Sequence, residues 1–408
     1  MLAGCKRLAG RYDRAVRVRI SDDERRRRVG ARHLLADGTK ATSLGEAASS
    51  LVVLHATDPV SVYLEAWARL ADATQAAIEH DLYDEPTALR MLAMRRTLFL
   101  VALPDVPIVF AAGSGDVARR ERPRTLKILA DGGSIPYPAD HFAELEEIAL
   151  AAIRERGEVS TTELRNVDPR LAERVTLARG KAYQGSMAVI SRVVHHLALD
   201  GRIGRGRPRG TWVSGQFRWS PIERWFPSGI PTRPIEEARA ELVRRWLRTF
   251  GPGTRDDIRW WTGCTVGLTR AALEAVGAVE VSLDGGGTGH ALPDDLEPTA
   301  SVPPWVALLP ALDATTMGWA GRDWYLGPHR PRLFDTNGNA GPTIWVDGRI
   351  VGGWAQRRSG EVVPFLLEDV GAETSNRIEA EAARLEAWIG PARVTGSFPT
   401  PLEIDLQR

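Results

Sequence analysis

The sequence has little cysteine, little lysine and no long apolar run. Two cysteines in 408 residues, Cys5 and Cys264, can build neither a disulfide framework nor a cysteine-based zinc site. No apolar run approaches the roughly 18 residues of a membrane span, and the basic start MLAGCKRLAGRYDRAVRVRI lacks the apolar core of a signal peptide. We therefore expect a cytoplasmic protein without a membrane segment, whose first residues are a short tail or precede the true start.

Basic charge is carried almost entirely by arginine, since Lys6, Lys40, Lys127 and Lys181 are the only lysines. Arginine suits bidentate contacts with anions, but a GC-rich genome gives the same bias and is the better explanation. The formal net charge is only +1. Affinity for a polyanion would therefore have to come from local clusters rather than from a globally basic surface.

The most informative segment is GSMAVISRVVHHLALDGRIGRGRPRGTWVSGQFRW, residues 185–219. Its apolar residues recur at helical spacing, which predicts a helix over 185–200 that Asp200 and Gly201 end. The glycines and proline that follow cannot continue a helix, and the arginines between them alternate as in a two-stranded hairpin. A helix joined to a basic hairpin is typical of a winged-helix unit, which makes nucleic acid the first partner to consider.

The same order of helices followed by a hairpin recurs before and after this segment. We predict helices over 21–36 and 74–83, a hairpin over 89–103, helices over 141–156, 233–250, 254–261 and 268–276, and a small hairpin around the DGGGTG turn. The predicted fold class is α+β, with three tandem winged-helix units and a C-terminal domain. The predicted domains are 1–135, 136–232 with the arginine-rich wing, 233–302 and 303–408.

Short apolar segments split by turns follow Pro303, and VDGR is a good hairpin signal. VALLPAL, RDWYL, PTIWVDGRIVGGW and EVVPFLL are predicted as strands, and residues 374–389 as a late helix. This pattern predicts a small, partly open β-barrel-like domain at the C-terminus.

Several of these segments resemble a known family. LHATDP (54–59), AMRRTLF (93–99), GRIGRGRPRGTW, LLPALD (308–313) and GNAGPTIWVDGRIVGGW (338–354) are similar to segments of the winged-helix DNA-binding family that includes the AlkZ/YcaQ-type bacterial DNA glycosylases. The resemblance spans roughly Ser21 to the C-terminus. It implies three winged helices and a β-barrel around duplex DNA, and release of purines that carry bulky alkyl groups.

The resemblance also implies a position for the hydrolytic water. Family glycosylases carry Gln-apolar-Gln or Gln-apolar-Asp just before Asp-Pro, and His55-Ala56-Thr57 occupies that position here, before Asp58-Pro59. The apolar centre and the Asp-Pro are kept, whereas both outer residues differ. His55 and Thr57 are the candidate catalytic residues on this basis.

The residue types are compatible with that chemistry. A purine alkylated at N7 is already a cationic leaving group, so the enzyme needs to orient a water rather than supply a strong acid. A neutral His55 could accept a proton from that water and Thr57 could hold it. In an extended segment, Ala56 would point to the other side. The alternative is that these residues only end a helix, with Asp58 as the N-cap of a helix that Pro59 begins, and for Asp58 we favour the cap.

Arginines on three predicted elements are candidates for DNA binding. Those of the wing and its helix favour phosphate contact over a merely solvated basic edge, whereas those of the first hairpin fit a backbone clamp and a plain hairpin tip equally. The candidates are Arg192, Arg202, Arg205, Arg207, Arg209, Arg95 and Arg96. The run from Arg25 to Arg28 is more simply a solvated helix face.

Together these features predict a duplex-DNA-binding protein, a glycosylase for bulky N7- or N3-alkylated purines in DNA repair or genotoxin self-resistance. We expect a monomer that is associated with the nucleoid and needs no metal or organic cofactor. The alternative is a winged-helix DNA binder without enzymatic activity, a regulator or lesion sensor, because the family's glutamines are absent from positions 55 and 57.

Overall fold

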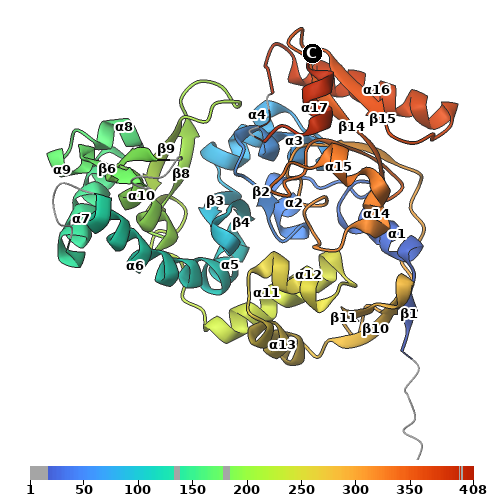
Figure 1. Cartoon of the computed structure of the whole chain (residues 1–408), viewed down its shortest axis with the longest axis horizontal. Helices are drawn as coiled ribbons and strands as arrows, with labels where there is room; N and C mark the ends of the chain where they lie inside the picture. The colour runs from blue at the N-terminus through green and yellow to red at the C-terminus, as the bar shows by residue number, and fades with distance from the viewer. Residues whose placement is uncertain (1–16, 133–137, 178–183, 395, 397) are drawn as a thin grey trace, which may run out of the picture.

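The chain forms two lobes that differ in size (Figure 1). The computed structural model describes residues 17–132, 138–177, 184–394, 396 and 398–408, so the predicted N-terminal tail lies largely outside the described residues. The segment from α6 (Gly115–Gly132) to β9 (Phe217–Pro221) forms one lobe and has a hydrophobic core of its own. Most of the remaining chain shares one continuous core, which runs from Val29 to Leu402, and a small separate cluster contains Ile20, Val281, Leu283 and Ala291.

The first segment contains three strands in one antiparallel sheet of order β2-β4-β3. The predicted hairpin is confirmed, and its tip carries Arg95 and Arg96 with φ of 57° and 66°. Both values lie in the left-handed region that non-glycine residues seldom adopt. The elements are α1 (Asp22–Arg32), α2 (Leu44–Ser50), β2 (Leu54–His55), α3 (Pro59–Arg69), α4 (Gln75–Glu79), β3 (Ala88–Leu92) and β4 (Leu98–Ala102).

The second segment adds a sheet of order β5-β9-β8 and a separate pair, β6-β7. The helix predicted over 185–200 begins only at Ile190, because Gly185–Ala188 pairs with Arg174–Leu177 as a strand. The elements are α5 (Val106–Val109), α6 (Gly115–Gly132), α7 (Ala139–Arg156), β5 (Val159–Ser160), α8 (Thr161–Leu164), α9 (Pro169–Ala172), β6 (Arg174–Leu177), β7 (Gly185–Ala188), α10 (Ile190–Leu199), β8 (Ile203–Pro208) and β9 (Phe217–Pro221).

The third segment follows the prediction closely, with three helices and a hairpin. A strand from the other end of the chain, β1 (Arg19–Ile20), joins the hairpin by pairing in parallel with β10. The elements are α11 (Ile235–Phe250), α12 (Arg255–Thr262), α13 (Val266–Ala275), β10 (Val279–Leu283) and β11 (Thr288–Ala291).

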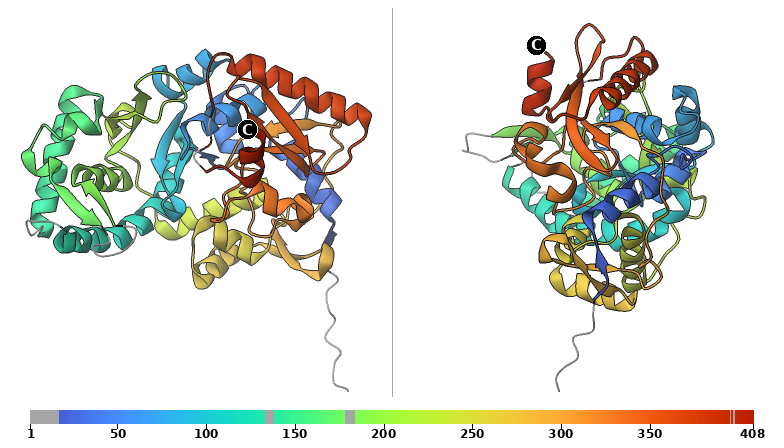
Figure 2. Two further views of the ribbon diagram at one scale, coloured as in Figure 1. Left: turned by 45° about the horizontal axis from the view of Figure 1, so that its top comes forward. Right: turned by 90° about the vertical axis from the view of Figure 1, so that its right-hand side faces the viewer.

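The C-terminal segment is an antiparallel sheet of order β12-β13-β14-β15, whose described strands form no closed barrel, so the partly open, barrel-like domain stays a prediction. Closure would require β12 to pair with β15, but α16 packs against both of these edge strands instead (Figure 2). RDWYL, predicted as a strand, forms the short helix α14. The elements are β12 (Val306–Leu309), α14 (Asp323–Leu326), α15 (Arg330–Leu333), β13 (Thr343–Val346), β14 (Arg349–Gln356), β15 (Val362–Leu366), α16 (Ala372–Ile389) and α17 (Pro401–Leu406).

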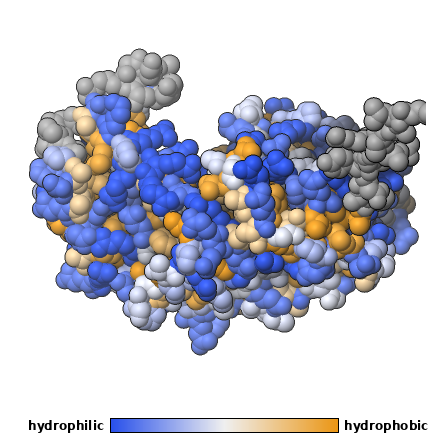
Figure 3. Space-filling model, turned by 90° about the horizontal axis from the view of Figure 1, so that it is seen from below, coloured by the Kyte–Doolittle hydropathy of each residue, from blue (hydrophilic) through white to orange (hydrophobic). Residues whose placement is uncertain are grey.

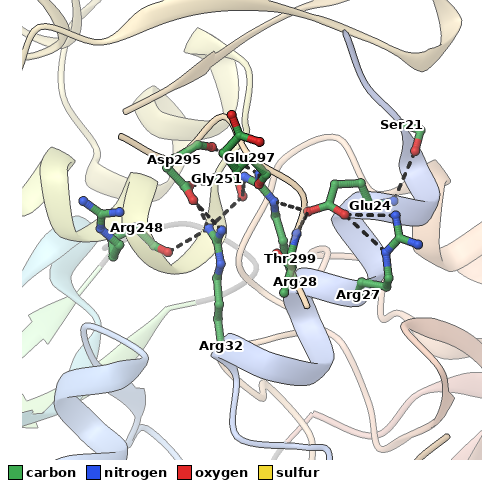
Figure 4. A network of polar contacts seen from close by, with 10 residues as sticks. All are labelled: Ser21, Glu24, Arg27, Arg28, Arg32, Arg248, Gly251, Asp295, Glu297 and Thr299. Atoms are coloured by element: carbon green, nitrogen blue, oxygen red, sulfur yellow. Dashed lines mark hydrogen bonds and ion pairs between the residues drawn. The ribbon is translucent and has the colours of Figure 1, made fainter. Parts of the chain in front are cut away.

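The expectation that Arg25 to Arg28 form a solvated helix face is wrong for Arg25 and Arg28, whereas Arg27 is exposed. Arg28 is 2% exposed, and its guanidinium donates to Glu24, to Asp295 and to backbone carbonyls (Figure 4). Arg25 is 7% exposed and lies over the ring of Trp324. Helix α1 is therefore buried on this side, because Asp22 and Glu24 of the same helix and the distant Asp295 neutralise its arginines.

A second buried ion pair joins α3 to the C-terminal segment. Arg69 donates to both carboxylate oxygens of Asp313 at 2.8 Å, and neither side chain is exposed to solvent. Arg69 also donates to Thr315 Oγ1, which contacts His33 Nδ1 at 2.9 Å. The pair therefore fixes how α3 lies against the loop that follows β12.

Every helix in the described part of the chain is either too short or too polar to cross a bilayer.

We expect the Arg69→Met substitution to lower the free energy of unfolding by about 3–5 kcal/mol, because it leaves the Asp313 carboxylate buried without its partner. Chemical denaturation measures this change. The double variant Arg69→Met/Asp313→Leu should recover most of the loss. As a matched control, Arg332→Met breaks the half-exposed pair with Asp405 and should cost less than about 1 kcal/mol. Equal losses in the two single variants would contradict the assignment.

Candidate active site and nucleic-acid interface

His55 lies at the end of β2, where the strand pairs with Phe99 of β4. Its backbone N–H donates to Glu65 Oε1 at 3.2 Å, and its ring packs edge-on against the ring of Phe99. The side chain is 8% exposed. Its Nε2 has no hydrogen-bond partner among the described residues, so it is the nitrogen left to bond a water.

Thr57 lies beside this ring and is exposed, whereas Ala56 between them is fully buried. The Thr57 backbone N–H approaches His55 Nδ1 at 3.5 Å, the long limit of a hydrogen bond. Asp58 is the N-cap of α3, since its carboxylate accepts from the Val60 N–H at 3.2 Å. The segment thus turns from strand to helix at the residue type and the proline that favour this turn.

The imidazole of His55 is held neutral. Burial lowers its pKa from 6.5 to about 3, and the positive charge of Arg95 contributes to the same direction. A neutral ring can exchange hydrogen bonds with water at physiological pH. His55 is therefore a hydrogen-bonding group for a water rather than a charged one.

Below His55 lies a buried acid that the sequence analysis missed. Glu65 is fully buried on α3, and no described residue forms a hydrogen bond with its Oε2. Burial raises its pKa well above the usual value, Asp313 raises it further, and Arg69 only partly opposes this. Charged residues four apart in the apolar helix PVSVYLEAWAR were the available signal. Glu65 supports the backbone of His55 from inside the protein.

Arginines from three elements gather beside the tip of the β3–β4 hairpin. Arg96 contacts Glu121 of α6 at 3.2 Å, and Arg124 lies 3.7 Å from the same carboxylate. Burial lowers the pKa of Arg192 on α10. The charges of Glu121, Arg124 and Arg96 also act on this pKa, so Arg192 lies near all three. A surface hollow here is lined by Arg95, Arg96, Val117, Arg120, Glu121, Arg124 and Gly263.

We refer to Arg96, Arg120, Arg124 and Arg192 as the basic cluster. Among the described residues that line the hollow, Glu121 is the single acid. Arg95, Arg96 and Arg192 are predicted from the sequence, whereas Arg120 and Arg124 are not, because nothing in the sequence of α6 indicates that it lies beside the hairpin tip. The structure brings all of them to one place, although they are nearly 100 residues apart in the chain.

The wing arginines lie elsewhere and are bound to the protein itself. Arg202 pairs with Glu147, and Arg209 pairs with Glu163, each at 2.5 Å. Arg207 reaches Glu79 and Asp84 in the first segment, at 2.8 and 2.7 Å. Arg205 lies against the rings of Phe217 and Trp219, and burial lowers its pKa to about 10. Contact of these four with DNA stays a prediction.

The loop of the wing packs against the large lobe. Trp212 is 6% exposed and lies 5.3 Å from the ring of Tyr63 and 5.5 Å from that of Trp388, measured between ring centroids. The wing thus contacts both α3 and α16. The surface seen from below is hollowed between the two lobes, and hydrophilic residues dominate the wall on the side of the second segment (Figure 3).

In the described part of the chain, no group of three or more histidine, cysteine or acidic side chains is arranged to hold a metal ion.

Comparison with known proteins identifies related chains. A family model described as DNA glycosylase AlkZ-like matches residues 48–388. The solved structure of Streptomyces sahachiroi DNA glycosylase AlkZ is similar, with a TM-score of 0.69 and 19% sequence identity over 91% of this chain and 97% of that one. No curated protein matches the chain. The structural match supports a shared fold over almost the whole length.

The neutral His55 predicts a pH dependence of stability. In the unfolded chain the imidazole binds a proton below about pH 6.5, whereas in the folded protein it does so only near pH 3. Unfolding between these values therefore takes up a proton, so stability falls as the pH falls through this window. We expect His55→Gln to reduce the slope of the unfolding free energy against pH by about 1.4 kcal/mol per pH unit.

Denaturant titrations from pH 4 to 8 measure this slope. Above about pH 7 the variant and the native protein should have parallel curves, which serves as the internal control. His33 and His196, whose pKa values burial also lowers to about 3, should maintain the remaining slope. An unchanged slope in His55→Gln would contradict the neutral, buried state of this ring.

Proposed function

Since the chain belongs to the AlkZ-like DNA glycosylase family, we propose that it hydrolyses the N-glycosidic bond of purines with bulky N7 or N3 alkyl groups in duplex DNA. DNA repair is the process to which this family points, and self-resistance to a genotoxin is a special case of it. The observation that carries the proposal is His55. It stands at the family's water-holding position, neutral, beside the exposed Thr57.

The reaction needs little from these residues beyond orientation. The alkylated purine leaves as a neutral base once the glycosidic bond breaks, and positive charge builds on the sugar. Since Nδ1 faces the Thr57 backbone N–H, the neutral ring carries its proton on Nε2, which donates a hydrogen bond to a water, and Thr57 Oγ1 holds the same water. An orienting ring is sufficient, because the water attacks a sugar that is already electron-poor.

The DNA itself would lie along the hollow between the lobes. We interpret the three segments of helices and hairpins as winged-helix units, which hold duplex DNA between them as a monomer associated with the nucleoid. The basic cluster supports phosphate contact, because four arginines share one acid there. The arginines of the wing are balanced by acids of the protein, so we assign them a smaller part.

We expect His55→Ala to slow the release of 7-methylguanine or a bulkier N7 adduct by about 100-fold to 10,000-fold, while binding to DNA is kept, because the water loses its orienting group. Alkaline cleavage of the abasic product on a labelled duplex measures the rate. His80→Ala, which alters a half-exposed histidine outside the site, is the control. Release at the native rate in His55→Ala would remove these residues from the mechanism.

The same assay separates the alternative function. The outer residues of the triplet are not the glutamines that the family carries, which favours a binder that has lost its activity. Tight binding to the adduct without base release by the native protein would support a lesion sensor. A footprint restricted to one DNA sequence would support a regulator.

We expect the triple variant Arg120→Ala/Arg124→Ala/Arg192→Ala to lower the slope of log K against log salt by about 2 to 3, because each phosphate contact contributes roughly 0.9. Fluorescence anisotropy on an undamaged duplex from low to moderate salt measures the slope. The variant Arg202→Ala/Arg207→Ala/Arg209→Ala is the matched comparison and should change the slope less. A larger change of the slope in the wing variant than in the cluster variant would indicate that the wing makes the main contacts with the DNA backbone.

A further inference from the structure

Two arginines lie against one tryptophan ring between the hairpin tip and the C-terminal segment. The guanidinium carbon of Arg95 is 4.3 Å from the centre of the Trp260 ring, and that of Arg322 is 4.9 Å from it. Arg95 comes from the β3–β4 turn, Trp260 from α12 and Arg322 from the residue before α14. Three distant parts of the chain thus bring two positive charges together.

Neither of these guanidinium groups forms an ion pair with a carboxylate in the described part of the chain. Arg322 is 5% exposed, and within the described residues its guanidinium makes a long hydrogen bond to the sulfur of Met317 and lies near the Tyr325 hydroxyl. The Nε atoms of Arg95 and Arg322 are both buried and have no hydrogen-bond partner among the residues that the structure describes. Asp257 is close enough to act on Arg322, but its Oδ1 already accepts from the backbone N–H groups of Ala320 and Gly321.

Other buried arginines of this protein are satisfied very differently. Arg69 has both oxygens of Asp313, and Arg28 has Glu24 and Asp295. A buried cation without such a partner is costly, and two that repel each other are more so. Desolvation, together with the charge of Arg322, lowers the pKa of Arg95 to about 10. This pair is therefore arranged for an anion that the protein itself does not supply.

One member of the pair, Arg95, is also near the candidate catalytic residue. Arg95 is the charged group that acts on the His55 ring, and it lines the hollow next to the basic cluster. A bare positive charge here would oppose the positive charge that develops on the sugar. An anion bound to Arg95 would neutralise this positive charge. If the anion is a phosphate of the DNA, it would also position the DNA strand between the basic cluster and His55.

We propose that Arg95 and Arg322, both held against Trp260, bind a phosphate of the DNA strand next to the nucleotide that is hydrolysed. The proposal rests on the proposed function for its ligand, a phosphodiester in DNA. It makes Arg95 a link between DNA binding and the site, because the same phosphate that anchors the strand neutralises the charge beside His55.

This phosphate-binding site can be tested without catalysis by a double-mutant cycle that combines an arginine substitution with removal of the charge of one phosphate. The probe is a duplex with a tetrahydrofuran abasic analogue, in which one phosphate on either side of the analogue is replaced by an uncharged methylphosphonate. Fluorescence anisotropy measures the dissociation constant for the native protein, Arg95→Gln and Arg322→Gln. Arg259→Gln is the matched control, because Arg259 precedes Trp260 on α12, is about half exposed and pairs with Asp256.

We expect methylphosphonate at one of the two positions to weaken binding by the native protein about 10-fold, the order of one charged hydrogen-bond pair. In Arg95→Gln the same methylphosphonate should weaken binding less than about twofold, because the positive charge that binds that phosphate is absent. The Arg259→Gln control should retain the full 10-fold loss. Since Arg95 is partly exposed, its variant stays informative even where Arg322→Gln does not fold.

The outcomes distinguish the phosphate-binding site from the proposed function. If each methylphosphonate weakens binding equally for the native protein and for Arg95→Gln, the phosphate-binding site is overturned and glycosylase activity is unaffected. If Arg95→Gln removes the effect of one methylphosphonate in a protein that releases no base, the result supports the phosphate-binding site in a DNA binder. If the native protein does not bind the duplex at all, both the phosphate-binding site and the proposed function are overturned.

Discussion

The ion pair between Arg69 and Asp313 is the constraint on which the arrangement of the site depends. It is completely buried, and a pair of this kind contributes more to geometry than to net stability, because removing two charges from water costs about as much as their attraction returns. One turn of α3 before Arg69 lies Glu65, whose carboxylate holds the backbone of His55. The position of the candidate catalytic residue relative to the C-terminal segment is thus set by an interaction remote from the solvent.

Features encoded by neighbouring residues could be predicted from the sequence. The Asp58-Pro59 helix start, the first hairpin and the VDGR turn depend on local conformational preferences, and the structure contains all three. Features that depend on distant partners could not be predicted. The pattern from Arg25 to Arg28 does not indicate that Asp295, 267 residues beyond Arg28, would neutralise the helix. The open sheet has the same origin, since a sequence of strands does not specify whether its edges pair.

The candidate site was predictable to a similar degree. The frame around His55 and the arginines of the hairpin tip are visible in the sequence, because a turn exposes its residues. Glu65 was not, since its role depends on a backbone group ten residues earlier. For the wing, the sequence predicts too much free charge. The alternation of arginines along the hairpin predicts which of them point outward, but not that they form ion pairs with Glu79, Asp84 and Glu147. Pairs of charges on different segments remain beyond sequence reasoning.

The packing of Trp212 between Tyr63 and Trp388 has a mechanical consequence. The tryptophan belongs to the small lobe and both neighbours belong to the large one, so any hinge motion that separates the lobes must first expose three aromatic rings to water. The two lobes should therefore keep a nearly fixed distance from each other. A ligand that enters between the lobes has to adapt its own shape, and a duplex locally weakened by a bulky adduct bends at lower cost than an intact one.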